Sequence, residues 1–203
     1  MNYYLTTSQK GRCAQLFWVI FISLISCFEI SAETTGPANF SGELKKWHKV
    51  TLTFNGPQTN EGATPNPFTD YRLNVVFKNG NKTLTIPGYY AADGNASESG
   101  ASAGNKWKVH LAPELTGRWT YTASFRKGTN VAMSPGANAG SSGDFMDGAT
   151  GYFDVTASDK TGLDNRAQGR LQYVNGHYLQ YAESKKYFLK QGADAPENLL
   201  AYQ

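Results

Sequence analysis

Cysteine and charge are both scarce in this sequence. Its 203 residues include only two cysteines, Cys13 and Cys27, and 17% of them are charged, against about 25% in an average globular protein. The formal net charge is +3, and Trp47 interrupts the densest basic stretch, Lys45–Lys49. We therefore expect no nucleic-acid partner, which would need a concentrated basic face. The length also argues against a complete α/β-barrel enzyme, which takes about 250 residues.

Long apolar runs are equally rare, and the one that stands out lies near the start of the chain. Leu16–Phe28 is a 13-residue apolar stretch after two basic residues. It is shorter than a membrane-spanning helix of about 20 residues but typical of a secretory signal. Cleavage after Ala32 would make 1–32 a signal peptide, which predicts an exported protein: extracellular, periplasmic or at the cell surface. Leu24–Cys27 also resembles a bacterial lipobox, so lipidation of Cys27, and membrane association only in that case, stays open.

The body of the chain alternates between apolar and polar residues. In Lys49–Phe54, the apolar residues Val50 and Leu52 share one face with the final phenylalanine. The same alternation recurs in five later segments: Tyr71–Phe77, Thr83–Ile86, Lys106–Leu111, Arg118–Phe125 and Gly151–Val155. Short strands at this spacing predict an all-β protein, an immunoglobulin-like antiparallel β-sandwich over 43–157 that follows a polar lead-in at 33–42.

Two connections in this region have low complexity. Residues 91–105 and 128–151 are rich in Gly, Ala, Ser and Asn. The second is longer than the roughly 12–15 residues of an ordinary connection. Its composition favours a mobile loop over a functional one.

No pattern predicts a metal site, a cofactor or an activated nucleophile. Asp93 and Glu98 are too close together for a helix–loop–helix calcium site. His48, His110 and His177 are dispersed, and we expect each at a half-exposed strand position. The one G-x-S-x-G match, Gly100–Gly104, lies within the low-complexity connection at 91–105 and does not indicate a nucleophile elbow. The sequence therefore predicts no metal, and the carboxylates near turns are best explained as caps and turn residues.

Aromatic residues offer the sharper functional hypothesis. Trp119 alternates within a strand, which favours core packing. Tyr89 and Tyr90 follow Pro87-Gly88 and lead into a loop, so we expect at least one ring to point outward. With Trp47, these two tyrosines are candidates for stacking on a carbohydrate or for contact with another domain, and both interpretations stay open.

After Ala157 the character of the chain changes. A polar linker at 158–168 precedes a predicted hairpin, Gly169–Tyr181, that turns at Asn175-Gly176. Lys186–Gly192 reads as a third strand. Because three short strands cannot build a core of their own, we expect 169–203 to be the truncated start of a second domain.

Several separated motifs point to one family. They are Asn66-Pro67-Phe68 with Asp70, Pro87–Ala91 with Asp93-Gly94, Trp107, and Pro113 followed by Gly117-x-Trp119-x-Tyr121. Together they resemble the immunoglobulin-like N-terminal domain of unknown function found on secreted bacterial proteins classed as candidate glycoside hydrolases. The motif Tyr187–Asn198 is similar to the entry into the (β/α)8 catalytic barrel that follows in that family. The likeness covers residues 43–203.

The resemblance implies a function and also a limit to it. The acid and nucleophile carboxylates of such barrels lie on later strands, so no catalytic residue is carried over. Asp194 and Glu197 would be structural, and the chain alone is expected to be inactive. The resemblance implies a non-catalytic accessory domain of an exported carbohydrate-active enzyme. Its partner would be the missing catalytic domain or a polysaccharide. The alternatives are an independent carbohydrate-binding module and a lipid-anchored surface adhesion domain.

Overall fold

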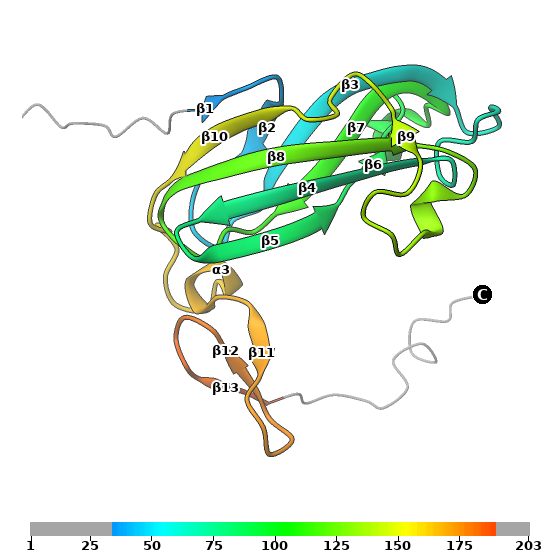
Figure 1. Ribbon diagram of the computed structural model, residues 1–203. Helices are drawn as coiled ribbons and strands as arrows, with labels where there is room; N and C mark the ends of the chain where they lie inside the picture. Colours follow the sequence, from blue (N-terminus) through cyan, green and yellow to red (C-terminus); the bar gives the residue numbers. More distant parts are fainter. Residues whose placement is uncertain (1–33, 190–203) are drawn as a thin grey trace, which may run out of the picture. The chain divides into compact units, whose positions relative to one another are not determined.

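The computed structural model describes residues 34–189, and almost all of their regular structure is β-sheet (Figure 1). One antiparallel sheet has the order β1-β10-β8-β4-β5, with β9 paired to β8. Its strands are β1 (Thr34–Thr35), β4 (Tyr71–Asn79), β5 (Lys82–Pro87), β8 (Gly117–Lys127), β9 (Ser141–Ser142) and β10 (Thr150–Val155). The second antiparallel sheet has the order β2-β3-β7-β6, formed by β2 (Asn39–Gly42), β3 (Val50–Asn60), β6 (Tyr89–Tyr90) and β7 (Ala103–Leu111).

The two sheets form the layers of a sandwich with one aromatic-rich core between them (Figure 1). The long strands β4 and β8 contribute every second residue to the core, as the pleat of a β-strand requires. Trp107 of β7 packs edge-on against Phe125 of β8 with ring centroids 4.8 Å apart, which joins one sheet to the other. The prediction of an all-β sandwich is confirmed. Trp119 is fully buried, as expected.

All six predicted strands are present, but the sandwich also recruits residues outside them. β2 lies in the predicted polar lead-in, pairs with β3, and places Phe40 against Phe153 with ring centroids 5.4 Å apart. The long loop after β8 contains a short 3₁₀ helix, η1 (Val131–Met133), and the strand β9. Arg72 of β4 donates hydrogen bonds to three carbonyl oxygens of this loop, those of Ser134, Gly136 and Ala137. The loop at 128–151 therefore makes defined hydrogen bonds to β4, which its low-complexity composition did not indicate.

The residues after the sandwich form a small separate sheet. Its antiparallel order is β11-β12-β13, with β11 (Leu171–Tyr173), β12 (Leu179–Tyr181) and β13 (Tyr187–Phe188). The predicted turn is confirmed, since Asn175 and Gly176 both have positive φ angles, 77° and 66°. A one-turn helix, α3 (Asn165–Gln168), lies within the predicted linker. Whether this sheet begins a barrel remains a prediction.

Three predictions lie outside the described residues. They concern the signal peptide, lipidation of Cys27, and the loop that holds Asp194 and Glu197. Within residues 34–189, no helix has the length and apolar character needed to cross a membrane.

Candidate functional site

The outer face of the four-stranded sheet carries polar and basic side chains. Because Trp107, Val109 and Leu111 of β7 point into the core, the alternating residues Lys108 and His110 point outward. The register places Thr51 of β3 opposite His110, and Tyr89 of β6 opposite Lys108. Strands distant in sequence thus bring these four side chains together on one surface.

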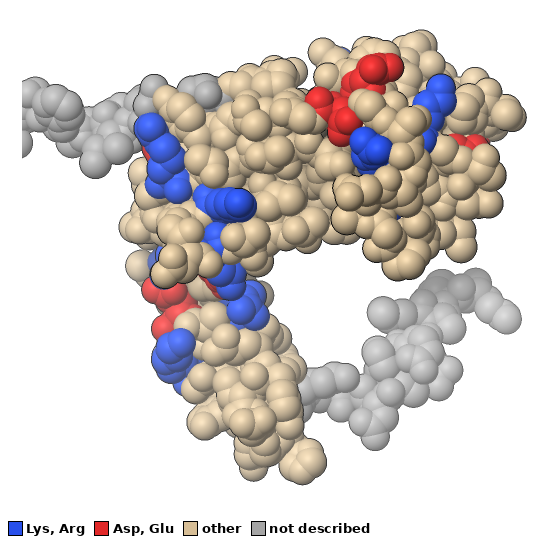
Figure 2. Space-filling model, viewed as in Figure 1, with Lys and Arg blue, Asp and Glu red and all other residues tan. Residues whose placement is uncertain are grey.

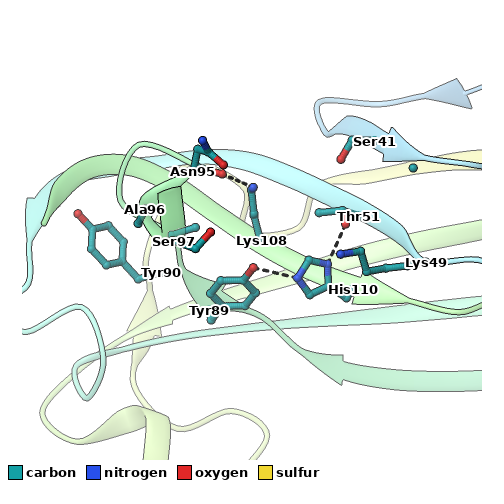
Figure 3. Close-up of a pocket in the computed structure, with 13 residues that line it drawn as sticks. Ser41, Lys49, Thr51, Tyr89, Tyr90, Asn95, Ala96, Ser97, Lys108 and His110 are labelled. Atoms are coloured by element: carbon teal, nitrogen blue, oxygen red, sulfur yellow. Dashed lines mark hydrogen bonds between the residues drawn. The ribbon is translucent and has the colours of Figure 1, made fainter. Parts of the chain in front are cut away.

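This surface is hollowed into a pocket of about 490 Å³, which we call the Tyr89 groove. Its floor comes from β2, β3, β6 and β7, and one wall comes from the loop that ends in the short helix α2 (Ala96–Ser99) (Figure 3). The lining residues are Ser41, Gly42, Lys49, Thr51, Tyr89, Tyr90, Ala91, Gly94, Asn95, Ala96, Ser97, Lys108 and His110. Among these described residues two are lysines, one is a histidine, and none is an aspartate or glutamate.

A row of hydrogen bonds fixes the floor of the groove. His110 Nδ1 lies 2.8 Å from Thr51 Oγ1, and His110 Nε2 lies 2.9 Å from the Tyr89 hydroxyl (Figure 3). The Tyr89 and His110 rings also pack together, with centroids 5.5 Å apart. Burial, together with the positive charges of Lys49 and Lys108, lowers the pKa of His110 below its ordinary value of 6.5. The imidazole is therefore neutral at pH 7, held in place by two hydroxyl groups.

The two lysines of the groove differ in how they are held. Lys108 donates a hydrogen bond from Nζ to the carbonyl oxygen of Gly94 and so ties the wall to the floor. Lys49, just before β3, is exposed to solvent. The nearby carboxylate of Asp93 faces its own loop, where it accepts hydrogen bonds from Asn95 N and Ser99 Oγ, each at 2.7 Å. The positive charge of Lys49 is thus available to a ligand.

The Tyr89-Tyr90 pair splits between surface and core. Tyr89 is 45% exposed, which confirms that at least one ring points outward. Tyr90 is 6% exposed, and its ring packs against Trp107 with centroids 5.4 Å apart. Its hydroxyl donates to the carbonyl oxygens of Thr59 and Gly104, at 2.8 and 3.2 Å. Tyr90 therefore offers no flat face to a carbohydrate, and Tyr89 is the ring of the pair that a ligand can reach.

Trp47, the third predicted contact residue, lies in the turn before β3 with a φ angle of 66°. Its indole Nε1 donates a hydrogen bond of 2.9 Å to Glu183, in the turn between β12 and β13. Lys46 pairs with the same carboxylate at 2.6 Å. Trp47 thus joins the sandwich to the small C-terminal sheet and lies outside the Tyr89 groove.

The expectation for two of the histidines was wrong. His48 is 2% exposed and lies in a turn, where its Nδ1 is 2.9 Å from Glu43 and its Nε2 is 2.9 Å from Ser158 Oγ. His177 lies in the hairpin turn with a φ angle of 71°, and only His110 is on a strand. Sequence spacing could not reveal the His48 cluster, because Ser158 is 110 positions away.

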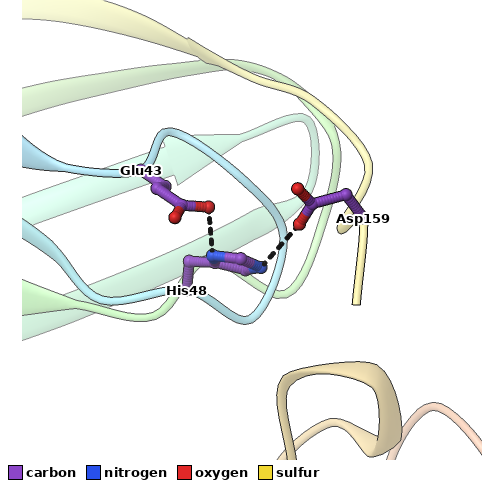
Figure 4. Close-up of side chains that lie close together, drawn as sticks. All are labelled: Glu43, His48 and Asp159. Carbon is purple, nitrogen blue, oxygen red and sulfur yellow. Dashed lines mark ion pairs between the residues drawn. The ribbon is translucent and has the colours of Figure 1, made fainter. Parts of the chain in front are cut away.

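Glu43, His48 and Asp159 bring their ligand-type atoms within 4.8 Å of one another, a geometry that a metal ion can use (Figure 4). Lys45 already lies between the two carboxylates, with Nζ 3.2 Å from Glu43 and 2.8 Å from Asp159. Its charge takes the place a cation would need. We therefore describe this cluster as an ion-paired clasp between the turn and the segment after β10.

The charged side chains on one face of the molecule show no single field. On the face presented in Figure 2, lysine and arginine are interspersed with aspartate and glutamate between broad areas of uncharged surface. Many of these charges are paired locally, such as Arg118 with Asp154 at 2.8 Å. The unpaired positive character of the groove lining is thus a local feature.

Comparisons with known proteins give short matches. The model of a family described as "Domain of unknown function (DUF5060)" matches residues 43–126, which confirms the predicted resemblance to such a domain for that region. Over 57 residues the chain is 44% identical to "Probable rhamnogalacturonate lyase A" of Aspergillus flavus. That match covers 26% of this chain and 11% of the lyase.

One solved structure was also compared with the fold. A crystal structure of a protein from Bacteroides vulgatus, described as a candidate glycoside hydrolase, aligns with 71% of this chain at 25% identity. The aligned part is 21% of that protein, and the TM-score of 0.46 is too low to carry an argument. This chain therefore spans only a small part of the length of either similar protein.

Proposed function

We propose that this chain carries a non-catalytic accessory β-sandwich of an exported carbohydrate-active enzyme and that the sandwich flanks a catalytic barrel. The observation that carries the carbohydrate association is the 44% identity over 57 residues to a protein named as a rhamnogalacturonate lyase. The family model adds that residues 43–126, most of the sandwich, match a recognised domain whose own function is unknown.

The carboxyl groups of the described residues support the non-catalytic part of the proposal. Glycoside hydrolysis uses two carboxyl groups, one of them with a raised pKa so that it can act as an acid. Here, hydrogen bonds from Lys45, Arg118 and Lys46 lower the pKa values of Glu43, Asp154 and Glu183, respectively. These groups stay ionised near neutral pH and cannot donate a proton to a leaving group.

The small C-terminal sheet supports a neighbouring domain. Its strands and the residues beside them expose six large apolar side chains, and such patches mark contact surfaces. They are Leu171, Tyr173, Tyr178, Leu179, Tyr187 and Leu189. A sheet of this size gains stability by packing against further structure, as the start of a catalytic barrel would do.

The test compares this chain with the protein encoded by the complete reading frame. Both are incubated with a panel of neutral and acidic polysaccharides. Hydrolysis is followed by new reducing ends, and elimination by the ultraviolet absorbance of unsaturated products. We expect cleavage by the complete protein and none by this chain. Cleavage by this chain, by either route, would refute the non-catalytic role.

Export is a separate part of the proposal. We propose that the chain is cleaved after Ala32, so that the mature protein starts at Glu33. The alternative is lipidation of Cys27, which would make the sandwich a surface-anchored domain. The independent carbohydrate-binding module also keeps its support, because the Tyr89 groove is a surface pocket with an exposed aromatic ring.

A further inference from the structure

The lining of the Tyr89 groove is one-sided in charge. Lys49 and Lys108 contribute positive charges, and none of the thirteen described lining residues is acidic. Positive groups around a concave surface attract an anion and hold it by charge-assisted hydrogen bonds. The carboxylate of Asp93, in the loop that forms the wall, accepts hydrogen bonds within its own loop. A ligand that fits this surface carries a negative charge.

The positions of the two lysines indicate where in the groove the negative charge of the ligand binds. Lys108 already donates to Gly94, which leaves the exposed Lys49 as the main cation for a ligand. Lys49 lowers the pKa of His110 after the larger effect of burial, so its charge acts on that ring. Figure 3 shows Lys49 at the His110 side of the groove, away from Asn95 and Ser97. The anionic group is therefore expected at Lys49, on the side of the groove where His110 lies.

The remaining lining suits the uncharged part of a sugar. Tyr89 presents a partly exposed ring, whose flat apolar face matches the C–H face of a pyranose. Ser41, Asn95 and Ser97 add neutral hydrogen-bonding groups for sugar hydroxyls. The volume of about 490 Å³ lies within the range of small-ligand pockets, roughly 300–1,000 Å³.

We propose that the Tyr89 groove binds a uronic acid residue of an acidic polysaccharide, with its carboxylate at Lys49 and its ring against Tyr89. This deepens the proposed function and rests on it for the choice of a sugar as the carrier of the charge. A single-stranded nucleic acid is disfavoured, because such sites use several stacking aromatics along a basic track. Tyr89 is the one exposed tyrosine among the described residues of this groove.

The test titrates the purified chain with trigalacturonate and with the same trisaccharide methyl-esterified at its carboxyl groups. We expect the ester to bind about tenfold more weakly, the usual worth of a charge-assisted contact. Lys49→Glu should weaken trigalacturonate binding by about tenfold or more. Lys78→Glu, a matched charge reversal at an exposed lysine of β4 in the other sheet, should leave it unchanged. Tyr89→Ala should weaken both ligands, because it removes the ring that both share.

Thermal melting of each variant checks that it is folded, and NMR signals of His110 locate the ligand at the groove. Absence of binding, equal binding of acid and ester, or equal loss in Lys49→Glu and Lys78→Glu would overturn the proposal. So would equal affinity for a sulfated glycan or a DNA oligonucleotide, since that indicates charge attraction without recognition. Cleavage by the chain would refute the accessory role and leave the uronate site standing, so the two failures are distinguishable.

Discussion

At the scale of single residues, the outward positions of β3, β6 and β7 decide what the sandwich can bind. Alternation in the sequence predicts which residues of β7 point outward, and an outward ring in the Tyr89-Tyr90 pair. It does not predict that Tyr89, Thr51 and His110 form one hydrogen-bonded row, because strand order sets that contact. The sequence therefore predicts which of these residues point outward. It does not predict that they meet in one groove.

The charge of Lys49 is expected to control the protonation of His110. Burial lowers the pKa of His110 first, and Lys49 and Lys108 lower it further. Replacing Lys49 with Met should therefore raise the pKa of His110 toward 6.5, its ordinary value. An NMR pH titration of the ring protons measures this directly. An unchanged pKa would contradict the placement of Lys49, and Lys78→Met serves as the control with no expected effect.

Gly56 is expected to be irreplaceable for a steric reason. A Cβ atom there would lie 2.4 Å from Cδ1 of the buried Trp107, which has no room to shift. Gly56→Ala should lower the free energy of unfolding by about 1–3 kcal/mol, typical of overpacking. Gly62→Ala, where the nearest atom is 3.6 Å away, is the matched control and should change it little. Urea denaturation of the two variants decides the point, and equal stabilities would contradict it.

At the scale of elements, the sequence predicts strands well and connections poorly. Alternation identifies β4 and β8 because each buries one face in the core. The sequence does not predict β2, because this four-residue edge strand contains one large apolar residue, Phe40, and so shows no alternation. The composition of the loop at 128–151 predicts mobility, because the groups that hydrogen-bond to it, such as Arg72 and the backbone N–H of Phe125, lie on strands outside the loop.

The clasp of Glu43, Lys45 and Asp159 should make stability depend on acidity. Lys45 lowers the pKa of Glu43 from 4.5, and Lys45 and Lys160 lower that of Asp159 from 3.8. A lowered carboxyl pKa adds stability that is complete above the ordinary value and is lost as the pH falls through the folded-state value. Lys45→Met should therefore show a flatter loss of melting temperature below about pH 4.5 than the parent.

Melting curves collected from pH 7 down to the acid limit of folding measure this slope. Lys78→Met, an exposed lysine outside the clasp, should keep the parent slope. Parallel curves for the parent and Lys45→Met would show that the clasp contributes nothing that acid can remove.

At the scale of the whole molecule, a sandwich and a small C-terminal sheet make up the described residues, and we propose an export signal before them. Trp47 and Lys46 join the sandwich to that sheet through Glu183. Glu183→Gln keeps the size of the side chain but removes the charge that pairs with Lys46. We expect faster limited proteolysis in the linker at 158–168, with the sandwich itself still resistant. Unchanged cleavage there would indicate that other contacts hold the sheet.

Export can be read from the mature protein. Mass spectrometry of chain secreted from a bacterial host should give an N-terminus at Glu33. A mass carrying lipid at Cys27 would support the anchored alternative, and retention of residues 1–32 without lipid would contradict both.

The central claim is that the sandwich serves a carbohydrate-active enzyme through contact with its polymer and not through chemistry. The most direct measurement uses the protein from the complete reading frame, with and without Lys49→Glu. Rates are measured on an acidic polysaccharide and on a short oligosaccharide of the same sugar. We expect Lys49→Glu to raise KM on the polysaccharide and to leave kcat and the short-substrate rate unchanged. Loss of turnover on both substrates, or on neither, by a folded variant would contradict it.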